Sequence, residues 1–546
     1  QQELDSLVNI IENLPFYDGT LFNKSKDIYG MMVSVSADVM NSPARVGLVK
    51  DVVAITEHFT EKYNLQMHYS GLPYIRVVNA ESIKGEMYMF IILSLLITTF
   101  ILYLFFRSFR IISFCLLIVL ICVSWTVGVM AMLGIKITLL TAMLPPLLIV
   151  ICIPNMVFMI NKFHAEFDRH GNKIKALQRM IQKIGNASFL SNLTTAAGFA
   201  TFIVTSSQIL VEFGITASIG ITFVYLVCLV MIPCGFSFMP EPDSKQIKHL
   251  HNKFITGTLD RVIRLILNHR NAVYITATTV VVLGAIGISL MKSTGYMVDD
   301  LKETDPIRQD LSFFEENFDG LMPLEVTVDF GKPKQVLNLN NLQKLDKLSE
   351  ELAQDEDISK PISLIEVIKF ANQAFYNGKP VYYRLPTNMT KNFILKYASQ
   401  STGAIGGQAN SFVDSTLQRV RLSFRVKDIG TKKMQEKENK LYEIVEKHFP
   451  NDRYTVKVTG SSIIFFKGTQ YLVFNLFTSL ALAILLIAVF MAWMFKSKRM
   501  VLVALIPNII PQIITAAIMG YFGIPIKAST ILVFSIAFGI SVDGTI

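Results

Sequence analysis

An acidic residue inside an apolar stretch near the end of the 546-residue sequence is the group best suited to chemistry. The stretch reads "AFGISVDGTI", and Asp543 stands well inside an apolar run that begins at Ala528. A charged side chain at the centre of a membrane span costs about 3 kcal/mol on insertion scales, so such a residue is a functional hypothesis by default. We expect Asp543 to take up and release a proton or to hold a cation. The alternative is a carboxylate that neighbouring Thr or Asn side chains hold for packing alone.

Two glycines flank this carboxylate in "GISVDG", and a threonine follows it. Small residues such as Gly539 and Gly544 let a second membrane helix approach closely, and the hydroxyl of Thr545 can hydrogen-bond a carboxyl group. We expect these three residues to support Asp543. Glycine is also common in helices that only pack, so that reading stays open.

The composition predicts a polytopic membrane protein. Hydrophobic residues make up 51% of the chain and the mean hydropathy is +0.44, values too high for an ordinary soluble protein. A helix that crosses a bilayer needs about 20 mostly apolar residues. Nine stretches qualify: 87–106, 111–131, 137–160, 186–206, 213–239, 272–291, 471–495, 500–521 and 528–546.

Lysine and arginine are concentrated in alternate short loops between these stretches. Loops of this kind stay on the cytoplasmic side. The two large polar segments, 1–85 and 292–470, are therefore expected on the outer side. Because this topology explains the net charge of +9, the sequence calls for no nucleic-acid partner.

The chain contains an internal repeat. "SGLPYIRVVNAESIKGEMYMFIILSLLITTFILYLFFRSFR", ending at Arg110, aligns with "TGSSIIFFKGTQYLVFNLFTSLALAILLIAVFMAWMFKSKR", ending at Arg499, so the offset is 499 − 110 = 389. Gly134 and Gly523 keep the same offset. Two membrane-parallel copies are the layout of transporters whose halves work against each other around sites near the bilayer midplane. A duplicated scaffold without transport is the alternative.

In the first copy, Asn155 stands where the second copy has Asp543. An amide can hydrogen-bond a carboxyl group in either protonation state but cannot carry a proton. We therefore expect Asn155 to be the partner of Asp543 in a proton relay. Thr194 and Thr195, in "SNLTTAAGFATF", either line this relay or only hydrogen-bond between helices.

Enzyme signatures are missing from the sequence: it holds no Walker A loop, GxSxG elbow, HExxH or CxxC motif. We expect no enzymatic activity, no metal and no cofactor, with a proton gradient as the energy source. All five cysteines fall in expected spans, so a disulfide framework outside the membrane is not expected. The sequence starts in polar residues without methionine and stops inside an apolar run, which favours an internal piece of a longer chain.

The repeated layout, "GISVDG", "TTAAGFATF" followed by "VEFGITASIGI", and "FEENFDGLMPLEVTV" together resemble the RND superfamily, and specifically its MMPL-like branch of lipid and hydrophobe exporters. Five spans, 87–239, also look like a sterol-sensing domain. The resemblance implies an RND-type helical bundle with an internal repeat and ferredoxin-like α+β porter domains outside the membrane. It divides the chain into the end of the first porter domain (1–85), a first, sterol-sensing-like bundle (86–239), a cytoplasmic linker (240–271), a helix that opens the second repeat (272–291), the second porter domain (292–470) and a truncated second bundle (471–546).

The resemblance also implies a function. Members of this branch are proton-driven exporters of lipids or other hydrophobic or amphipathic molecules across a bacterial-type inner membrane, and Asp543 matches the family's proton-relay aspartate. The family usually has Asp followed by Tyr at both relay positions, whereas here Asn155 precedes Met and Asp543 precedes Gly. Expected partners are the membrane and a lipid or hydrophobic small-molecule substrate, and a homo-oligomer is left open. The alternative function is a non-transporting lipid- or sterol-sensing or protein-export auxiliary protein on the same fold.

Overall fold

The described residues of the chain form two compact units. One combines residues 1–78 with 294–470 and is called the α+β unit below; the other combines 79–293 with 471–546 and is called the helical unit. The computed structural model describes residues 19, 21–23, 25–33, 35–40, 42–242, 253–291, 295–296, 304–320, 322–394, 411–450, 452–526, 530, 533–534, 537–539 and 541.

Eight helices in the described part of the chain are long and apolar enough to cross a membrane, which confirms the polytopic fold class. The ninth expected span, 528–546, lies largely outside the described residues. The helices are α4 (Leu72–Phe106), α5 (Phe109–Met132), α7 (Leu144–His170), α8 (Lys173–Ala200), α9 (Gln208–Phe238), α12 (Arg270–Ser289), α19 (Ser461–Phe495) and α20 (Lys498–Tyr521).

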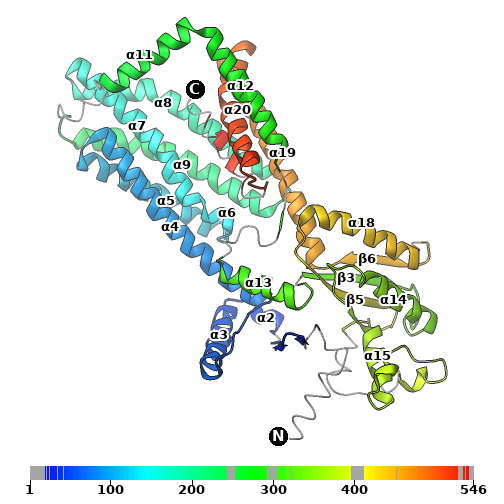
Figure 1. Ribbon diagram of the computed structural model, residues 1–546. Coiled ribbons are helices and arrows are strands. Elements are labelled where there is room, and N and C mark those ends of the chain that lie inside the picture. The colour runs from blue at the N-terminus through cyan, green and yellow to red at the C-terminus, as the bar shows by residue number, and fades with distance from the viewer. Residues whose placement is uncertain are drawn as a thin grey trace. The chain divides into compact units, whose positions relative to one another are not determined.

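Helices α5, α7, α8 and α9 pack against one another and contain most of the core of the helical unit (Figure 1). Ile118, Cys152 and Phe213, from three of these helices, are fully buried. The short helices α6 (Leu139–Ala142) and η1 (Thr201–Val204) lie next to α7 and α8 in the chain. Asn155 on α7 and Asn192 on α8 are buried within this group, so these two polar side chains face other helices.

The expected repeat is visible in the backbone. Helices α4 and α19 both have 35 residues, and their starts differ by 461 − 72 = 389 positions; α5 and α20 both have 24 residues at the same offset, 498 − 109 = 389. The turns match as well: Arg107 and Lys496 have φ of 46° and 52°, and Gly134 and Gly523 have φ of 66° and 67°. The two copies therefore turn the chain in the same way at equivalent positions.

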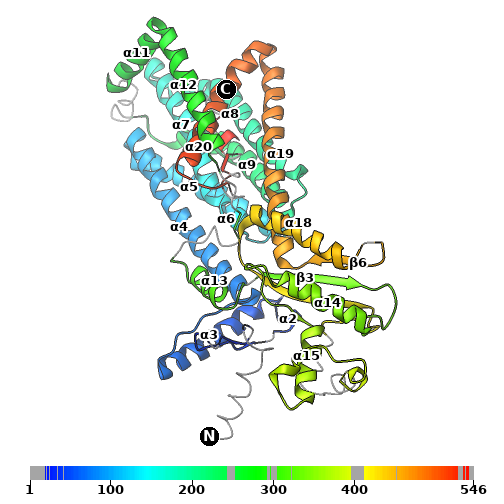
Figure 2. The same ribbon diagram turned by 45° about the vertical axis from the view of Figure 1, so that its right-hand side comes forward.

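Helices α12 and α20 cross at small residues (Figure 2). A Cβ atom added to Gly520 would lie 1.7 Å from the backbone oxygen of Gly287, and one added to Gly287 would lie 2.7 Å from Cα of Ala517. The hydroxyl of Tyr521 donates a hydrogen bond of 2.7 Å to the carbonyl oxygen of Leu283. Small residues permit this close contact between membrane helices.

The expected linker 240–271 contains a helix, α11 (Lys253–Asn268). Its apolar residues recur at helical spacing, and Leu259, Val262, Ile263 and Ile266 are all about half exposed. Its charged residues Arg261 and Arg264 lie outside that stripe. The linker is thus partly an amphipathic helix that leads directly into α12.

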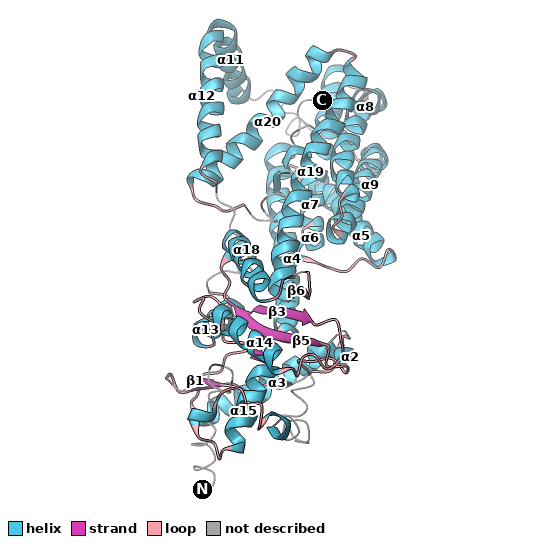
Figure 3. Cartoon of the chain, turned by 90° about the vertical axis from the view of Figure 1, so that its right-hand side faces the viewer, coloured by secondary structure: helices cyan, strands magenta, loops and turns pink. Residues whose placement is uncertain are grey.

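A four-stranded antiparallel sheet, with strand order β4-β5-β3-β6, forms the centre of the α+β unit (Figure 3). The order along the chain is strand, helix, strand, strand, helix, strand, with α15 (Leu364–Phe375) inserted after β4. This arrangement is that of a ferredoxin-like fold and agrees with the predicted fold class. The elements are β3 (Met322–Asp329), α14 (Leu339–Leu352), β4 (Ile362–Ser363), β5 (Arg419–Val426), α18 (Gly430–His448) and β6 (Thr455–Thr459).

The strands form because their apolar residues alternate with polar ones. In β3, Leu324, Val326 and Val328 are buried while the residues between them are not, so one face of the sheet is apolar. Helices α14 and α18 cover this face through residues such as Leu345 and Leu441. The register is Val326 opposite Leu422 of β5 and Val458 of β6.

Further elements of the α+β unit come from both parts of the chain. The helix α13 begins after Asp305, whose carboxylate accepts the backbone N–H of Ile307 at 2.9 Å and so caps its N-terminus. The remaining elements are β1 (Phe22–Asn23), β2 (Ile28–Tyr29), α2 (Ala37–Met40), α3 (Ala44–Tyr63), α13 (Pro306–Asn317) and η3 (Pro380–Tyr382).

Candidate functional site

Asn155 lies on α7 and is 6% exposed. It forms a reciprocal amide pair with Asn192 of α8: Asn155 Nδ2 donates to Asn192 Oδ1 at 3.1 Å, and Asn192 Nδ2 donates to Asn155 Oδ1 at 2.7 Å. Ser188, one turn before Asn192 on α8, donates its hydroxyl to the same Asn155 oxygen at 2.7 Å. These three residues form a buried polar cluster between two membrane helices, called the amide cluster below.

Local sequence explains why the cluster forms here. Ser188 and Asn192 are four residues apart, so they lie on one face of α8. On α7, Pro154 has no N–H to donate to the carbonyl one turn earlier, and the side chain of Asn155 donates a hydrogen bond of 3.1 Å to the carbonyl oxygen of Ile151. The side chain of Asn155 is therefore also tied to the backbone of its own helix, one residue after the carbonyl of Val150 that lacks its usual donor.

Thr195 links α8 to the segment that precedes Asp543 in the sequence. Its hydroxyl is fully buried and lies within hydrogen-bond distance of two carbonyl oxygens, that of Gly539 at 3.1 Å and that of Ser191 at 3.0 Å, which share its one proton as acceptors. In the described part of the chain, the hydrogen bonds of the Thr194 hydroxyl stay within α8, where the carbonyl oxygen of Ser191 lies 2.8 Å away. Of the two threonines, Thr195 is the one that joins the two copies of the repeat.

Gly539 packs against α8 at a distance that a larger residue would also permit. A Cβ atom there would lie 3.6 Å from Cγ2 of Thr195 and 3.9 Å from the ring of Phe199, which are ordinary contact distances. The distance between this segment and α8 therefore leaves room for a small side chain at position 539, so the contact does not require glycine there. Asp543, Gly544 and Thr545 lie outside the described residues, so their predicted roles stay predictions.

A second polar contact joins the same segment to α20. Ser541 donates its hydroxyl to Oδ1 of Asn508 at 2.8 Å, and Asn508 Nδ2 donates to the carbonyl oxygen of Ala504 at 3.0 Å. Asn508 is 1% exposed. Sequence reasoning missed this residue; an amide between Pro507 and Pro511 in a mostly apolar span was the available signal.

Residues 5–239 match the sequence profile of the MMPL family. This part of the chain, a little under half of its length, is similar to the MMPL family. A membrane protein of Methanocaldococcus jannaschii is 29% identical over 119 residues, which are 22% of this chain and 30% of that protein. The match thus spans less than a third of the length of this curated relative.

The MMPL match takes in α7 and α8, and hence the whole amide cluster, whereas α20 and the segment of Gly539 lie beyond it. The likeness of 87–239 to a sterol-sensing domain remains a prediction. Chemically, the amides and hydroxyls of the cluster can donate and accept hydrogen bonds but do not titrate near neutral pH. The cluster by itself therefore offers no group that could carry a proton; the predicted carrier, Asp543, follows Ser541 by two positions.

Glu166, near the end of α7, is the centre of an ion cluster that sequence reasoning did not find. Its side chain is 1% exposed, and its oxygens lie 3.1 Å from Nζ of Lys183, 3.2 Å from Nζ of Lys162 and 3.3 Å from Nη1 of Arg179. His170 lies 3.6 Å away. Because a buried carboxylate requires paired charge, this cluster holds the end of α7 to the start of α8.

Proposed function

We propose that the chain is a secondary active, proton-coupled exporter of lipids or other hydrophobic or amphipathic molecules, acting across a bacterial-type inner membrane with its porter domains outside. The transport class rests on the similarity of residues 5–239 to the MMPL family. The observation that carries the coupling part is the hydrogen bond from Thr195 to Gly539, since it joins the helix of the amide cluster to the segment that leads to Asp543.

In this proposal Asp543 carries the proton and the neutral groups of the first copy respond to its charge. A deprotonated carboxylate attracts hydrogen-bond donors such as hydroxyl and amide groups, and a protonated one donates a hydrogen bond itself. Protonation of Asp543 would therefore change the hydrogen bonds that its carboxyl group forms with the first copy of the repeat. This change would alter how strongly the two copies hold together. Their alternation between two arrangements would carry substrate outward.

The test is gradient-driven efflux of a fluorescent lipid-like reporter from vesicles that contain the full-length protein. We expect Asp543→Asn to abolish efflux that depends on the proton gradient, because an amide cannot carry the proton. Glu212→Gln is the matched control: Glu212 sits near the start of α9 with its carboxylate bonded to Gln208 on the same helix, and this variant should keep efflux.

Two results would count against the proposal. If the correctly folded Asp543→Asn variant keeps gradient-driven efflux, the carboxylate of Asp543 does not couple transport to protons and serves packing alone. Absence of gradient-driven efflux in the wild type, together with retained lipid binding, would favour the non-transporting lipid-sensing or auxiliary function.

A further inference from the structure

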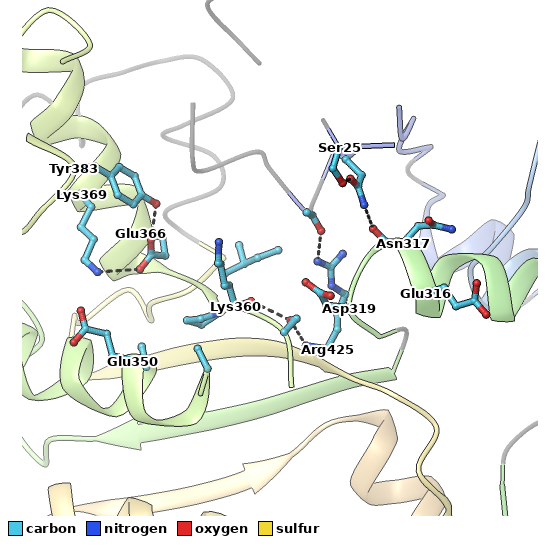
Figure 4. Close-up of a pocket in the computed structure, with 17 residues that line it drawn as sticks. Ser25, Glu316, Asn317, Asp319, Glu350, Lys360, Glu366, Lys369, Tyr383 and Arg425 are labelled. Atoms are coloured by element: carbon cyan, nitrogen blue, oxygen red, sulfur yellow. Dashed lines mark hydrogen bonds and ion pairs between the residues drawn. The ribbon is translucent and has the colours of Figure 1, made fainter. Parts of the chain in front are cut away.

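A cavity of about 780 Å³ in the α+β unit is lined by charged groups that the protein itself pairs or that face water (Figure 4). Arg425 donates to the carbonyl oxygen of Gly19 at 2.5 Å, Lys369 Nζ lies 3.4 Å from Glu366, and the hydroxyl of Tyr383 donates to the other oxygen of Glu366. The other charged side chains of the lining are exposed to solvent: Glu316, Asp319, Glu350 and Lys360. These charges therefore call for no ligand, and we turn to a surface of the helical unit.

Helix α11 exposes an apolar side that no other described element covers. Its apolar stripe is 47–54% exposed and consists of Leu259, Val262, Ile263 and Ile266. An isolated helix of 16 residues, the length of α11, is only marginally stable in water. Burial of the apolar stripe in a partner outside the described protein would therefore stabilise this helix.

The charged residues of α11 lie opposite this stripe. At about 3.6 residues per turn, the stripe occupies an arc of about 100°, and Arg261 and Arg264 lie on the far side of the helix. Both arginines are exposed, and Nε of Arg264 donates to a neutral group, the carbonyl oxygen of Asp260, at 3.2 Å. The helix contains three cationic residues and one acidic residue, so its net charge is 3 − 1 = +2. Apolar residues on one side and arginines on the other are typical of helices that lie in a membrane surface.

The connection of α11 to α12 indicates what covers the stripe. Helix α11 ends at Asn268, and α12, which is long and apolar enough to cross a membrane, begins at Arg270. His269 between them has φ of −126° and ψ of 49°, which is not helical, and Figure 1 shows the two helices meeting at a sharp angle. The end of α11 therefore lies where α12 enters the membrane, and α11 leaves the direction of that span.

We propose that α11 lies in the membrane surface at the start of α12 and binds anionic lipids. The apolar stripe enters the lipid and contributes binding to a membrane of any headgroup, whereas Arg261 and Arg264 attract the phosphate groups of anionic headgroups. The orientation predicted from the loop charges makes this the cytoplasmic leaflet. This surface concerns lipid binding and does not depend on proton coupling or on the exported substrate.

The test is hydrogen–deuterium exchange of the backbone amides of α11, measured on the full chain in nanodiscs. One set of nanodiscs contains phosphatidylcholine alone, and the other contains phosphatidylcholine with phosphatidylglycerol, which is anionic. We expect exchange in α11 to be at least about fivefold slower with phosphatidylglycerol, because each arginine near an anionic surface strengthens the attachment. Equal exchange rates in the two sets would overturn the preference for anionic lipids.

Variants separate the two sides of the helix. The double variant Arg261→Gln with Arg264→Gln should exchange at the same rate in both sets of nanodiscs. Ile263→Ser should speed up exchange in both sets; serine and isoleucine have similar helix propensities, so this effect reports the lost lipid contact.

The matched control is Arg169→Gln with Lys175→Gln, which removes two exposed cations from α7 and α8 and should leave exchange in α11 unchanged. A lipid difference that survives in the double arginine variant of α11, or that disappears in this control, would overturn the role of the two arginines.

A second measurement distinguishes lipid from protein as the partner of the stripe. A fluorescent label is attached to Ile263→Cys, on the stripe, or to Asn268→Cys, on the opposite side, each in a Cys234→Ser variant. Lipids with brominated acyl chains should quench the label at position 263 at least about twofold more strongly than the label at position 268, because the stripe faces the acyl chains. Equal quenching at the two positions would mean that another protein surface covers the stripe, and it would overturn the proposal.

Discussion

At the scale of single residues, the amide pair of Asn155 and Asn192 supplies a test of the polar cluster. Asn155→Leu should destabilise the protein by about 2 kcal/mol, because it leaves the buried groups of Asn192 and Ser188 without their partner. Asn192→Leu should have a similar cost. The double variant should cost clearly less than the two single costs together, since no lone amide remains. Thermal unfolding in detergent measures all three, and strictly additive costs would contradict a direct pairing.

Glu166 is the second residue whose role can be tested alone. Glu166→Gln removes the charge that Lys162, Arg179 and Lys183 share, so these cations repel one another at the α7–α8 corner. We expect the unfolding temperature to fall by several degrees, with a smaller fall at high salt because salt screens the repulsion. Glu212→Gln serves as the control, and an equal effect in both variants would argue against a special role for Glu166.

At the scale of elements, the crossing of α12 and α20 depends on Gly520. Gly520→Ala would place a methyl group against the backbone of Gly287, and neither backbone can move without separating the helices. We expect a loss of about 1–3 kcal/mol, as for overpacked cores. Gly128→Ala on α5 is the matched control, because a Cβ atom there meets nothing within 4 Å. Thermal unfolding that ranks the two variants equally would refute the crossing geometry.

The β3–β5 pair carries a pH-dependent contact. Asp329 accepts hydrogen bonds from Gln418 and from the backbone N–H of Gly331, and it pairs with Arg419 at 2.7 Å; these contacts hold the pKa of Asp329 below its ordinary value of 3.8. A lowered pKa in the folded state means that the contact stabilises the fold above pH 3.8 and loses this effect as the pH falls through the folded pKa.

The corresponding experiment compares the wild type with Asp329→Asn between pH 6 and pH 3. We expect the variant to unfold at a lower temperature at pH 6, and the difference to begin to shrink once the pH falls below 3.8, because the carboxylate of the unfolded chain takes up a proton there before that of the folded chain does. A difference that stays constant over this range would show that Asp329 acts through its shape and not through its charge.

At the scale of the whole molecule, the membrane topology remains a prediction from charge. Cys234 is the exposed one of the five natural cysteines, so the experiment starts from a Cys234→Ser variant. In this variant, a cysteine introduced by Lys332→Cys should react with a membrane-impermeant maleimide added to intact cells. Lys498→Cys, in the basic turn between α19 and α20, should react only after the cells are opened. The reverse pattern would invert the orientation and place the α+β unit inside.

The sequence by itself determined the apolar helices and the repeat. The apolar runs had to be about 20 residues long because a bilayer leaves no water for backbone groups, and the alternation in β3 and β5 had to follow the pleat of a strand. The same helical spacing could also have identified α11 inside the expected linker. These features are local, so they can be read from neighbouring residues.

Only the tertiary structure decided which polar groups meet. Asn155 was predicted as a partner for Asp543, which lies outside the described residues, so this pairing stays a prediction; the side chains that Asn155 contacts in the described chain are Asn192 and Ser188. Asn508 with Ser541, the cations around Glu166 and the charged cavity of the α+β unit join residues that are far apart in sequence. Such contacts depend on how helices and strands pack, because packing sets the distance and direction between side chains and residue order alone does not.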